Sequence, residues 1–254
     1  MFVRTLLSAL MIGVMPVSAA FASGDGPAIP SQDWSFSGPF GTYDKASLQR
    51  GYKIYRNVCS SCHSMKRVYF RNLEALGYNE DQIKAIASEY TVINKEPNDE
   101  GDMFERPAKP SDHFVSPFAN DNAAKFANGG ALPPDLSLIT KARGNGPNYV
   151  YSLLTGYEEA PHGQDVAQGQ HWNKYFPGHK LSMAPPLSDG LVSYEDGSPE
   201  TLDQYSRDMV QFLTWAADPH MEERKTMGMK VILFLMMFAG ILYAVKRKIW
   251  AHLH

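Results

Sequence analysis

The chain has 254 residues, a formal net charge of −3 at neutral pH, and 44% hydrophobic residues. All 27 acidic residues lie between residues 23 and 223, where only 17 of the 24 basic residues lie, so this span carries a net charge near −10. Binding to phosphate requires the opposite sign, so the charge argues against nucleic acid and favours a cationic protein partner. A span of about two hundred residues is also long enough for one domain with a buried core.

Residues 1–22 predict a secretory signal peptide. One basic residue, Arg4, precedes a short apolar run, and Ala20-Phe21-Ala22 forms a small-x-small cleavage site. An N-terminal membrane anchor is the alternative, but the apolar run is short for a span. We therefore expect residues 1–22 to be cleaved and residues 23–223 to form a domain outside the cytoplasm.

Three segments in the first two thirds of the domain predict amphipathic helices. Asp44 is expected to cap the first, which runs directly into the stretch "CSSCH". The second covers residues 79–92 and the third residues 146–157. The residues expected to face the core are Leu48, Tyr52 and Tyr55 in the first helix, Ile83, Ile86 and Ala87 in the second, and Tyr149, Leu153 and Leu154 in the third.

The clearest helix comes last, with Ser198 as N-cap, Pro199 at the first helical position and Pro219 at its end. Its apolar stripe consists of Leu202, Tyr205, Met209, Phe212, Leu213 and Ala216. Strand patterns are nearly absent, and proline and glycine crowd the segments between the helices. The fold class predicted is therefore mainly α with long irregular loops, an arrangement that a large buried cofactor would help to organise.

Cys59 and Cys62 are the only cysteines, and His63 follows them directly. A thioredoxin-type disulfide motif would lie beside a parallel sheet, and the sequence shows no such sheet. A zinc site would need a second cysteine or histidine pair with metal-ligand spacing, which the sequence lacks. The third interpretation is attachment of haem c, in which two thioethers hold the porphyrin and the next histidine binds iron. In an exported protein this pattern favours one covalently attached haem c.

The iron then needs a sixth ligand from the opposite face of the ring. Met183 lies in "KLSMAPPLSDG", a loop stiffened by two prolines, and a thioether ligand suits a haem that carries electrons. Core packing is the alternative role for Met183. A bis-histidine site also stays open, with His113, His162, His171 and His179 as the candidates.

The C-terminal segment predicts a membrane anchor. Fifteen uncharged residues, 231–245, lie between Lys230 and Lys246, and residues 227–246 approach the ~20 residues that a spanning helix needs. A buried core helix is the alternative, but a basic triplet directly follows the apolar run. By the positive-inside rule, we expect residues 247–254 to form a short cytoplasmic tail behind one transmembrane helix.

The motifs "CSSCHSM", "NGGALPPDLS", "VYSLLTGY", "YFPGHKLSMAPPL" and "QFLTWAADPHMEERKTMGMK" together resemble the cytochrome c1 family, and the resemblance covers nearly the whole mature chain. It implies a cytochrome c-like helical haem domain of the bacterial type. In the family the methionine of the "MAPP" loop is the sixth ligand, which corresponds to Met183. Arg143 matches a position that pairs with a haem propionate, and Asn128, Pro134 and Tyr149 match positions that line the haem pocket.

The resemblance implies an electron-transfer subunit of ubiquinol–cytochrome c oxidoreductase rather than an enzyme acting alone. The haem would accept an electron from the Rieske iron–sulfur protein and pass it to a soluble cytochrome c. Cytochrome b and membrane lipid are the further partners implied, in a dimeric complex in the inner membrane with its haem domain in the periplasm. Some bacterial relatives have a disulfide in the loop before the methionine; this chain lacks those cysteines, so we expect packing and proline to stiffen residues 156–182.

Two other functions compete with this interpretation. A haem c subunit of another membrane dehydrogenase or oxidase would carry several CxxCH sites or a copper-ligand cluster, and the sequence has neither. A haem-based gas sensor or anchored binding module would have an iron that binds carbon monoxide readily when reduced. A six-coordinate haem with histidine and methionine ligands should not do so.

Overall fold

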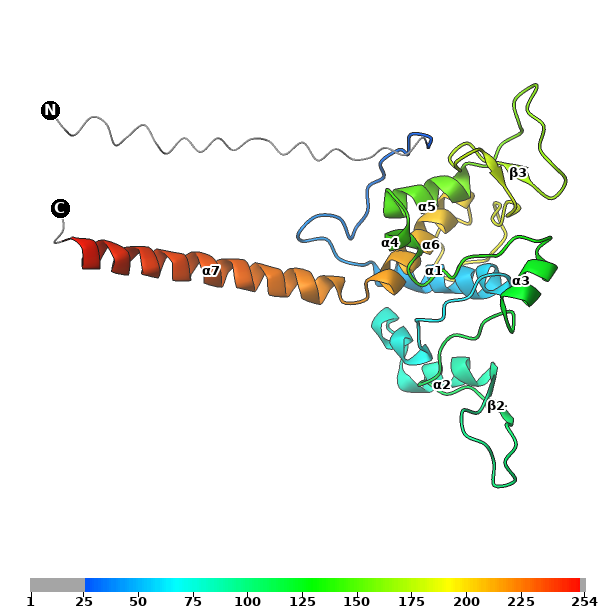
Figure 1. Cartoon of the computed structure of the whole chain (residues 1–254), viewed down its shortest axis with the longest axis horizontal. Coiled ribbons are helices and arrows are strands. Elements are labelled where there is room, and N and C mark those ends of the chain that lie inside the picture. The colour runs from blue at the N-terminus through cyan, green and yellow to red at the C-terminus, as the bar shows by residue number, and fades with distance from the viewer. Residues whose placement is uncertain (1–25, 252–254) are drawn as a thin grey trace.

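The structure is a computed structural model that describes residues 26–251, so the signal peptide expected over residues 1–22 lies outside it. The described residues form a helical head and one long helix, α7 (Met221–Trp250), which extends away from the head (Figure 1). Strands occur only as two antiparallel pairs of two or three residues each within the described range. The expected mainly helical fold with long irregular loops is confirmed.

The centre of the head is the contact between α1 (Lys45–Asn57) and α6 (Leu202–Ala217). Asp44 caps α1 as expected, because its carboxylate accepts hydrogen bonds from the backbone N–H groups of the first turn. Gly51 lets the two helices approach closely, since a Cβ atom there would overlap the backbone oxygen of Asp208. The expected inward residues of both helices are mostly buried, and the largest side chains at this contact are Leu48, Tyr52, Tyr55, Tyr205, Met209 and Phe212.

The segment after α1 forms the lower part of the head in Figure 1. It consists of two 3-10 helices, η1 (Cys59–Ser61) and η2 (Phe70–Leu76), then α2 (Glu80–Ser88) and a hairpin. The hairpin pairs β1 (Thr91–Ile93) with β2 (Glu105–Pro107), and its loop projects from the head.

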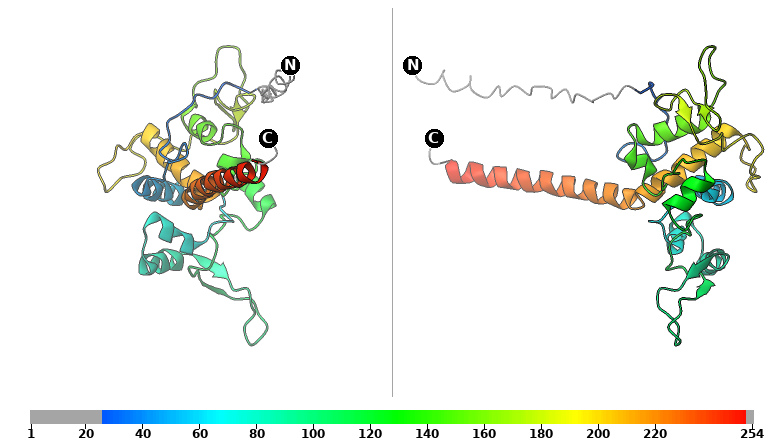
Figure 2. Two further views of the ribbon diagram at one scale, coloured as in Figure 1. Left: turned by 90° about the vertical axis from the view of Figure 1, so that its left-hand side faces the viewer. Right: turned by 45° about the vertical axis from the view of Figure 1, so that its right-hand side comes forward.

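The remaining elements form the upper part of the head and its right-hand side in Figure 1. A short helix α3 (Asp121–Ala127) and the single turn α4 (Ile139–Ala142) precede α5 (Gly146–Thr155), which packs against α6. A small hairpin of β3 (His171–Trp172) and β4 (Lys180–Leu181) follows α5. Figure 2 shows that this hairpin and the β1–β2 hairpin lie at opposite ends of the head.

Two predicted helix boundaries were wrong. The second helix was expected to run to residue 92, but α2 ends at Ser88 and residues 91–93 form the strand β1, which pairs with β2. The last helix of the head begins at Leu202 with Thr201 as its N-cap, not with Ser198 and Pro199. The backbone N–H of Ser198 instead donates to the Asp196 carboxylate, and that of Tyr194 donates to the carboxylate of Glu200. These bonds hold residues 194–200 as a loop. Pro219 follows the end of the helix as expected, since α6 ends at Ala217.

Helix α7 contains the whole segment 227–246 that was expected to be an anchor. Its most apolar stretch has a mean hydropathy of 2.1 and is not covered by the rest of the chain, so by length and composition α7 could cross a membrane. The first turn is tied to the head: the Lys225 Nζ donates to the backbone oxygens of Phe36 and Gly41 at 2.7 and 2.9 Å. The Glu222 carboxylate accepts from the Tyr43 N–H at 2.7 Å.

Candidate haem site

The two cysteines lie at the end of α1, where the chain turns through η1. The backbone N–H groups of Cys62 and His63 both donate to the carbonyl of Cys59, at 3.2 and 2.9 Å, so the turn brings the three side chains into one short loop. Both thiols are free. Burial raises the pKa of Cys59 to about 12, with a further contribution from Cys62.

The imidazole of His63 is held in one orientation. Its Nδ1 lies 2.8 Å from the backbone oxygen of Pro134. A carbonyl oxygen only accepts, so Nδ1 carries the proton and Nε2 presents a free lone pair. Burial lowers the pKa of His63, and the bond to Pro134 and the nearby Asp135 only partly offset this effect. His63 is therefore neutral at physiological pH, as a metal ligand must be.

The loop that supplies Pro134 is joined to the cysteine loop at several points. The N–H of Leu136 donates to the Ser64 carbonyl at 2.8 Å. The carboxylate of Asp135 accepts from the Ser64 hydroxyl and the Lys66 N–H, both at 2.8 Å. Burial raises the pKa of Asp135, but its hydrogen bonds outweigh burial and the pKa lies below its ordinary value. Asp135 was not expected as a site residue, although its place after two prolines in "PPDLS" is typical of a carboxylate that binds backbone N–H groups.

Asn128 lies at the start of the same loop. It ends α3, and its side-chain amide donates to the Ala124 carbonyl at 2.8 Å. Its own carbonyl accepts from the N–H of Ala131 at 3.1 Å. The polar atoms of Asn128 therefore shape the loop that leads to Pro134.

Arg143 and Tyr149 lie on the connection from α4 to α5 and on the first turns of α5. The Arg143 side chain is exposed, and its guanidinium donates only to the carbonyl of Ala142, at 3.1 Å. Burial raises the pKa of Tyr149, and the charge of Arg143 opposes this increase, which places the two side chains near each other. Arg143 thus has no carboxylate partner within residues 26–251.

Met183 lies just after β4 and is partly buried. The hydroxyl of Tyr157 donates to the Met183 carbonyl at 3.0 Å, a contact that the sequence analysis missed. Burial raises the pKa of Tyr157, and Tyr149 adds to the shift. Arg143, Tyr149, Tyr157 and Met183 thus form one group of neighbours. No hydrogen bond within the described range joins this group directly to His63.

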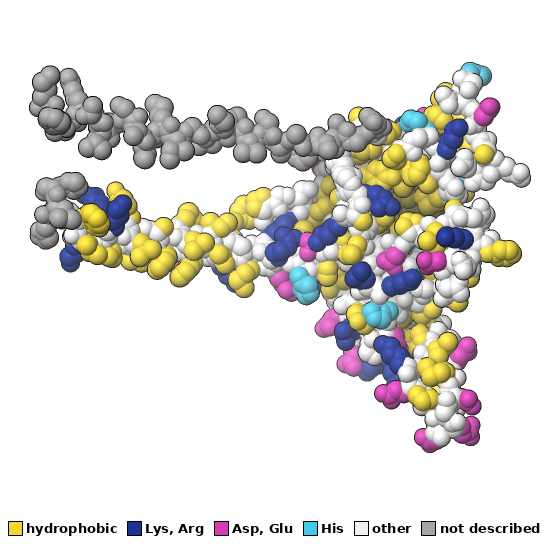
Figure 3. Space-filling view, viewed as in Figure 1, with side chains coloured by type: hydrophobic (Ala, Val, Ile, Leu, Met, Phe, Trp, Pro, Cys, Tyr) yellow, Lys and Arg dark blue, Asp and Glu magenta, His cyan; other side chains and the backbone are white. Residues whose placement is uncertain are grey.

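The surface beside these groups suits a large apolar cofactor. Figure 3 shows an apolar, hollowed area over α5, next to the segment that carries β3. Leu132, in the loop before Pro134, exposes 44% of its surface, although aliphatic side chains are ordinarily buried. Two free thiols, a neutral imidazole and unburied apolar side chains are the donor set and the lining that haem c requires.

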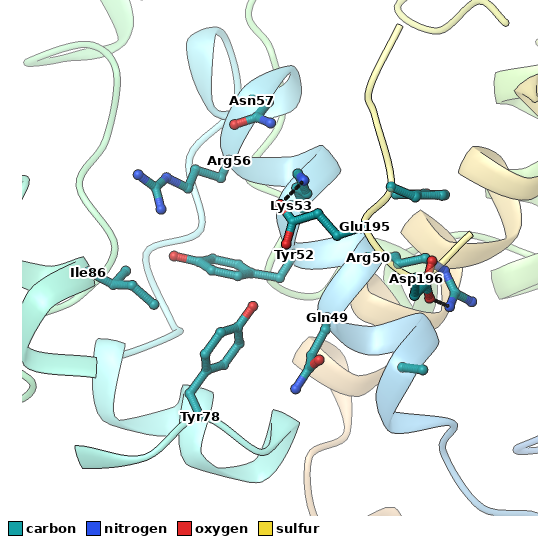
Figure 4. Close-up of a pocket in the computed structure, with 12 residues that line it drawn as sticks. Gln49, Arg50, Tyr52, Lys53, Arg56, Asn57, Tyr78, Ile86, Glu195 and Asp196 are labelled. Carbon is teal, nitrogen blue, oxygen red and sulfur yellow. Dashed lines mark hydrogen bonds and ion pairs between the residues drawn. The ribbon is translucent and has the colours of Figure 1, made fainter. Parts of the chain in front are cut away.

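A second hollow, of about 520 Å³, lies between α1, the side chains of Tyr78 and Ile86, and the loop at residues 194–196 (Figure 4). Four of its charged side chains pair with one another: Arg50 binds Asp196 at 2.7 Å and Lys53 binds Glu195 at 3.1 Å. It contains none of the expected site residues. The zinc interpretation also finds no support, since residues 26–251 contain no group of three or more His, Cys, Asp or Glu side chains that could hold a metal ion.

Comparison with known proteins identifies the family. A family model described as "Cytochrome C1 family" matches residues 34–253. The chain is 49% identical to the cytochrome c1 of Rhodospirillum rubrum over 97% of this chain and 96% of that protein. It is 51% identical to the mitochondrial heme protein cytochrome c1-2 of Solanum tuberosum over 89% and 86% of the two chains. A "Cytochrome b/c1" of Bradyrhizobium diazoefficiens is 49% identical over 97% of this chain, which spans 39% of that longer protein. The chain therefore belongs to the cytochrome c1 family of electron-transfer proteins that carry haem c, as its sequence motifs indicated.

Proposed function

We propose that Cys59 and Cys62 hold haem c through two thioethers and that His63 and Met183 bind its iron. The observation that carries this proposal is the hydrogen bond from His63 to Pro134, which leaves Nε2 as the free nitrogen of a neutral ring. When bound, the haem supplies one-electron redox chemistry. The role of the chain is to fix the ligands, exclude water and set the potential.

The pocket residues have separate roles in this proposal. Pro134 orients the ligating imidazole through its carbonyl, and Asn128 shapes the loop that carries Pro134. Tyr149 is part of α5, over which the hollowed apolar area lies. Arg143 is exposed and has no acidic partner in the described range, so its guanidinium is available to pair with a haem propionate.

The electron route requires partners on both sides of the haem. We propose that the Rieske iron–sulfur protein supplies the electron and that a soluble cytochrome c takes it away, so that the chain acts as a redox subunit of ubiquinol–cytochrome c oxidoreductase. One relative is called "Cytochrome b/c1", and this chain matches 39% of it. That name supports cytochrome b as a neighbour in the complex. A dimeric complex follows from the same family resemblance.

The proposed topology has residues 23–223 in the periplasm and residues 227–246 in the inner membrane, with residues 247–254 in the cytoplasm. The length and exposure of α7 support a span surrounded by lipid. The basic residues Lys246, Arg247 and Lys248 support the cytoplasmic side for its C-terminal end.

The test of the ligand assignment is Met183→Leu in the full, haem-loaded chain. We expect the haem to stay attached while the sulfur-to-iron absorption band disappears. The midpoint potential should fall, since a methionine ligand favours ferrous iron, and about 60 mV corresponds to a tenfold change for a one-electron couple. Carbon monoxide should bind the ferrous variant readily but not the wild type.

An unchanged potential and an intact absorption band in Met183→Leu would contradict the assignment and favour one of the histidines. Attachment is tested separately by extraction with acid and acetone, which should leave the haem on the wild-type chain. A haem that washes out would show that the two thioethers are absent.

A further inference from the structure

The segment from Gly156 to Ser182 leads from α5 to Met183 and contains no cysteine. Packing and proline were expected to stiffen it. In the structure, hydrogen bonds of two side chains, Asn173 and Tyr157, also connect the segment to the rest of the head. Both residues contact parts of the chain that are distant from them in sequence.

Asn173 is fully buried and joins three parts of the chain. Its side-chain Nδ2 donates to the carbonyl of Leu153, in α5, at 2.8 Å. Its Oδ1 accepts from the N–H of Tyr175 at 3.0 Å and thereby closes the turn that follows. Its backbone N–H donates to the carbonyl of His179 at 2.8 Å, across the β3–β4 hairpin that ends two residues before Met183.

At the end of α5, the backbone of Gly156 is closely packed against the segment around Asn173. The carbonyl of Gly156 accepts from the Lys174 N–H at 3.0 Å. A Cβ atom at position 156 would lie 2.5 Å from the Tyr175 ring and 2.6 Å from the Ser152 carbonyl. Buried polar atoms are costly to leave unpaired, so the side-chain amide of Asn173 fixes the hairpin against α5.

Tyr157 connects this junction to Met183 itself. It pairs with Asn173 in an isolated β-bridge, and its hydroxyl donates to the Met183 carbonyl at 3.0 Å. Its side chain is partly buried, and its hydroxyl is the donor in this bond, because a carbonyl oxygen only accepts. The backbone of Met183 is thus bonded directly to a residue that the Asn173 junction holds.

We propose that Asn173 and Tyr157 are positioning residues that hold Met183 at the iron, in the role that a disulfide would otherwise have. This inference rests on the proposed ligation of the iron by Met183. A methionine whose backbone is held by a hydrogen bond would re-form its bond to the metal faster than one on a free loop. The fraction of protein with a detached methionine is therefore low in the wild type.

The first test is Tyr157→Phe in the haem-loaded chain, with Tyr151→Phe as the matched control. Tyr151 lies in α5 and its hydroxyl donates to the carboxylate of Asp203, away from Met183. Loss of one hydrogen bond changes an equilibrium by about fivefold. We expect Tyr157→Phe to bind carbon monoxide about fivefold faster when reduced. Its ferric form should lose the sulfur-to-iron band at a pH about 0.7 units lower, a shift that corresponds to the same fivefold change. Tyr151→Phe should match the wild type in both measurements.

The second test measures the junction without using the haem spectrum. Asn173→Asp keeps the acceptor for Tyr175 but replaces the donor to Leu153 with a second oxygen. Backbone amides of residues 171–181 should exchange with deuterium at least fivefold faster than in the wild type, and those of α6 should be unchanged. Carbon monoxide binding should accelerate with them.

Two results would overturn the positioning role: carbon monoxide binding in Tyr157→Phe at the wild-type rate, or faster exchange in Asn173→Asp with carbon monoxide binding at the wild-type rate. A wild-type protein that lacks the band altogether would instead overturn the ligation by Met183. The two failures are therefore distinguishable.

Discussion

At the scale of single residues, His63 and Arg143 differ in how many hydrogen bonds within the chain fix their orientation. His63 is fixed by the Pro134 carbonyl at Nδ1 and by the Tyr55 hydroxyl, which donates to the His63 carbonyl at 3.3 Å. The Arg143 guanidinium has one hydrogen bond, to the adjacent carbonyl of Ala142. The protein therefore preorganises the proposed axial ligand, whereas the propionate partner proposed for Arg143 would come only with the cofactor.

Arg143→Ala should therefore lower the midpoint potential of the haem without changing the stability of the haem-free chain. In the haem-free chain we expect a change in unfolding free energy within about 0.5 kcal/mol, because the side chain is exposed. In the haem-loaded chain the midpoint potential should fall by some tens of millivolts, since a positive charge beside the cofactor favours the reduced state. Redox titration and thermal unfolding measure the two quantities, and Arg143→Lys should retain most of the potential. A potential equal to that of the wild type would show that Arg143 does not pair with the haem.

At the scale of elements, the contact between α1 and α6 depends on Gly51. A methyl group there would meet the Asp208 backbone and would lie 2.6 Å from the Phe212 Cβ. Alanine favours a helix over glycine by about 1 kcal/mol, but overpacking a close contact costs about 1–3 kcal/mol. The atom that the methyl group would meet belongs to the backbone, so the upper end of this cost applies. Less the gain in helix propensity, we expect Gly51→Ala to lower the free energy of unfolding by about 2 kcal/mol in chemical denaturation. Lys45→Ala, on the exposed side of the same helix, should leave it nearly unchanged; an equal or more stable Gly51→Ala would mean that the helices can move apart freely.

The base of the β1–β2 hairpin is closed by an ion pair with a defined pH dependence. Arg106 donates to both oxygens of the buried Asp112 carboxylate, at 2.7 and 3.0 Å, and this lowers the pKa of Asp112 from 3.8 to about 2. A depressed folded-state pKa stabilises the native state above pH 4, and the contribution is lost as the pH falls toward 2. Asp112→Asn should therefore lower the unfolding free energy at neutral pH by about 1–2 kcal/mol.

The difference between Asp112→Asn and wild type should shrink when unfolding is measured at successively lower pH below 4. Asp99→Asn, at an exposed position in the hairpin loop, is the control and should show little difference at any pH. A gap that stays constant down to pH 2 would assign the stabilisation to packing rather than to the charge of Asp112.

The elements differ in how far the sequence alone could predict them. Helix α1 and its Asp44 cap follow from local signals, because the cap, the apolar stripe and the cysteine motif are contiguous. The start of α6 was misplaced because Ser198 and Pro199 are a valid local start signal, whereas the contacts of Asp196 and Glu200 that override it are tertiary. Asn173 and Tyr157 carry no local signal at all. Asparagine is common in loops, and only the fold brings its amide to the Leu153 carbonyl.

At the scale of the whole molecule, the head and α7 are joined through a strap formed by residues 36–43. Besides Lys225 and Glu222, the Tyr43 hydroxyl donates to the carbonyls of Thr214 and Asp218, at 3.2 and 3.1 Å. The strap therefore bonds to the end of α6 and to the start of α7, on both sides of Pro219. This arrangement fixes the direction of the proposed anchor relative to the head and to the candidate haem site.

The acidic surface of the head is not uniform. Three of the acidic residues form ion pairs: Asp196 with Arg50, Glu195 with Lys53, and Asp203 with Arg207. Each pairing reduces the negative electrostatic potential around the acid. Ion pairs are absent, within the described part of the chain, for the loop carboxylates Glu96, Asp99, Glu100, Asp102 and Glu105. That loop projects from the end of the head opposite β3 (Figure 1). Glu158 and Glu159 line a hollow of about 330 Å³ that also includes Pro185, two residues from Met183. Glu158 has a loose ion pair with Lys174, at 3.9 Å, and Glu159 has none within the described residues.

The distance of each acidic group from Met183 predicts which of these acids steer a cationic soluble acceptor toward the haem. Long-range steering raises association rates by ~10- to 1000-fold at low salt and fades as the Debye length falls to about 8 Å near physiological ionic strength. We expect electron transfer to the acceptor to slow steeply with added salt in the wild type, and replacement of Glu158 and Glu159 by glutamine to flatten this dependence. The same replacement of the five carboxylates in the loop at residues 96–105 should have the smaller effect, although it removes more charge, because that loop lies at the far end of the head. Stopped-flow rates over a series of salt concentrations measure the slopes. A larger effect from the loop variant would show that the acceptor docks at the β1–β2 hairpin instead. Rates that do not depend on salt in any of the three proteins would show that these acids do not steer the acceptor.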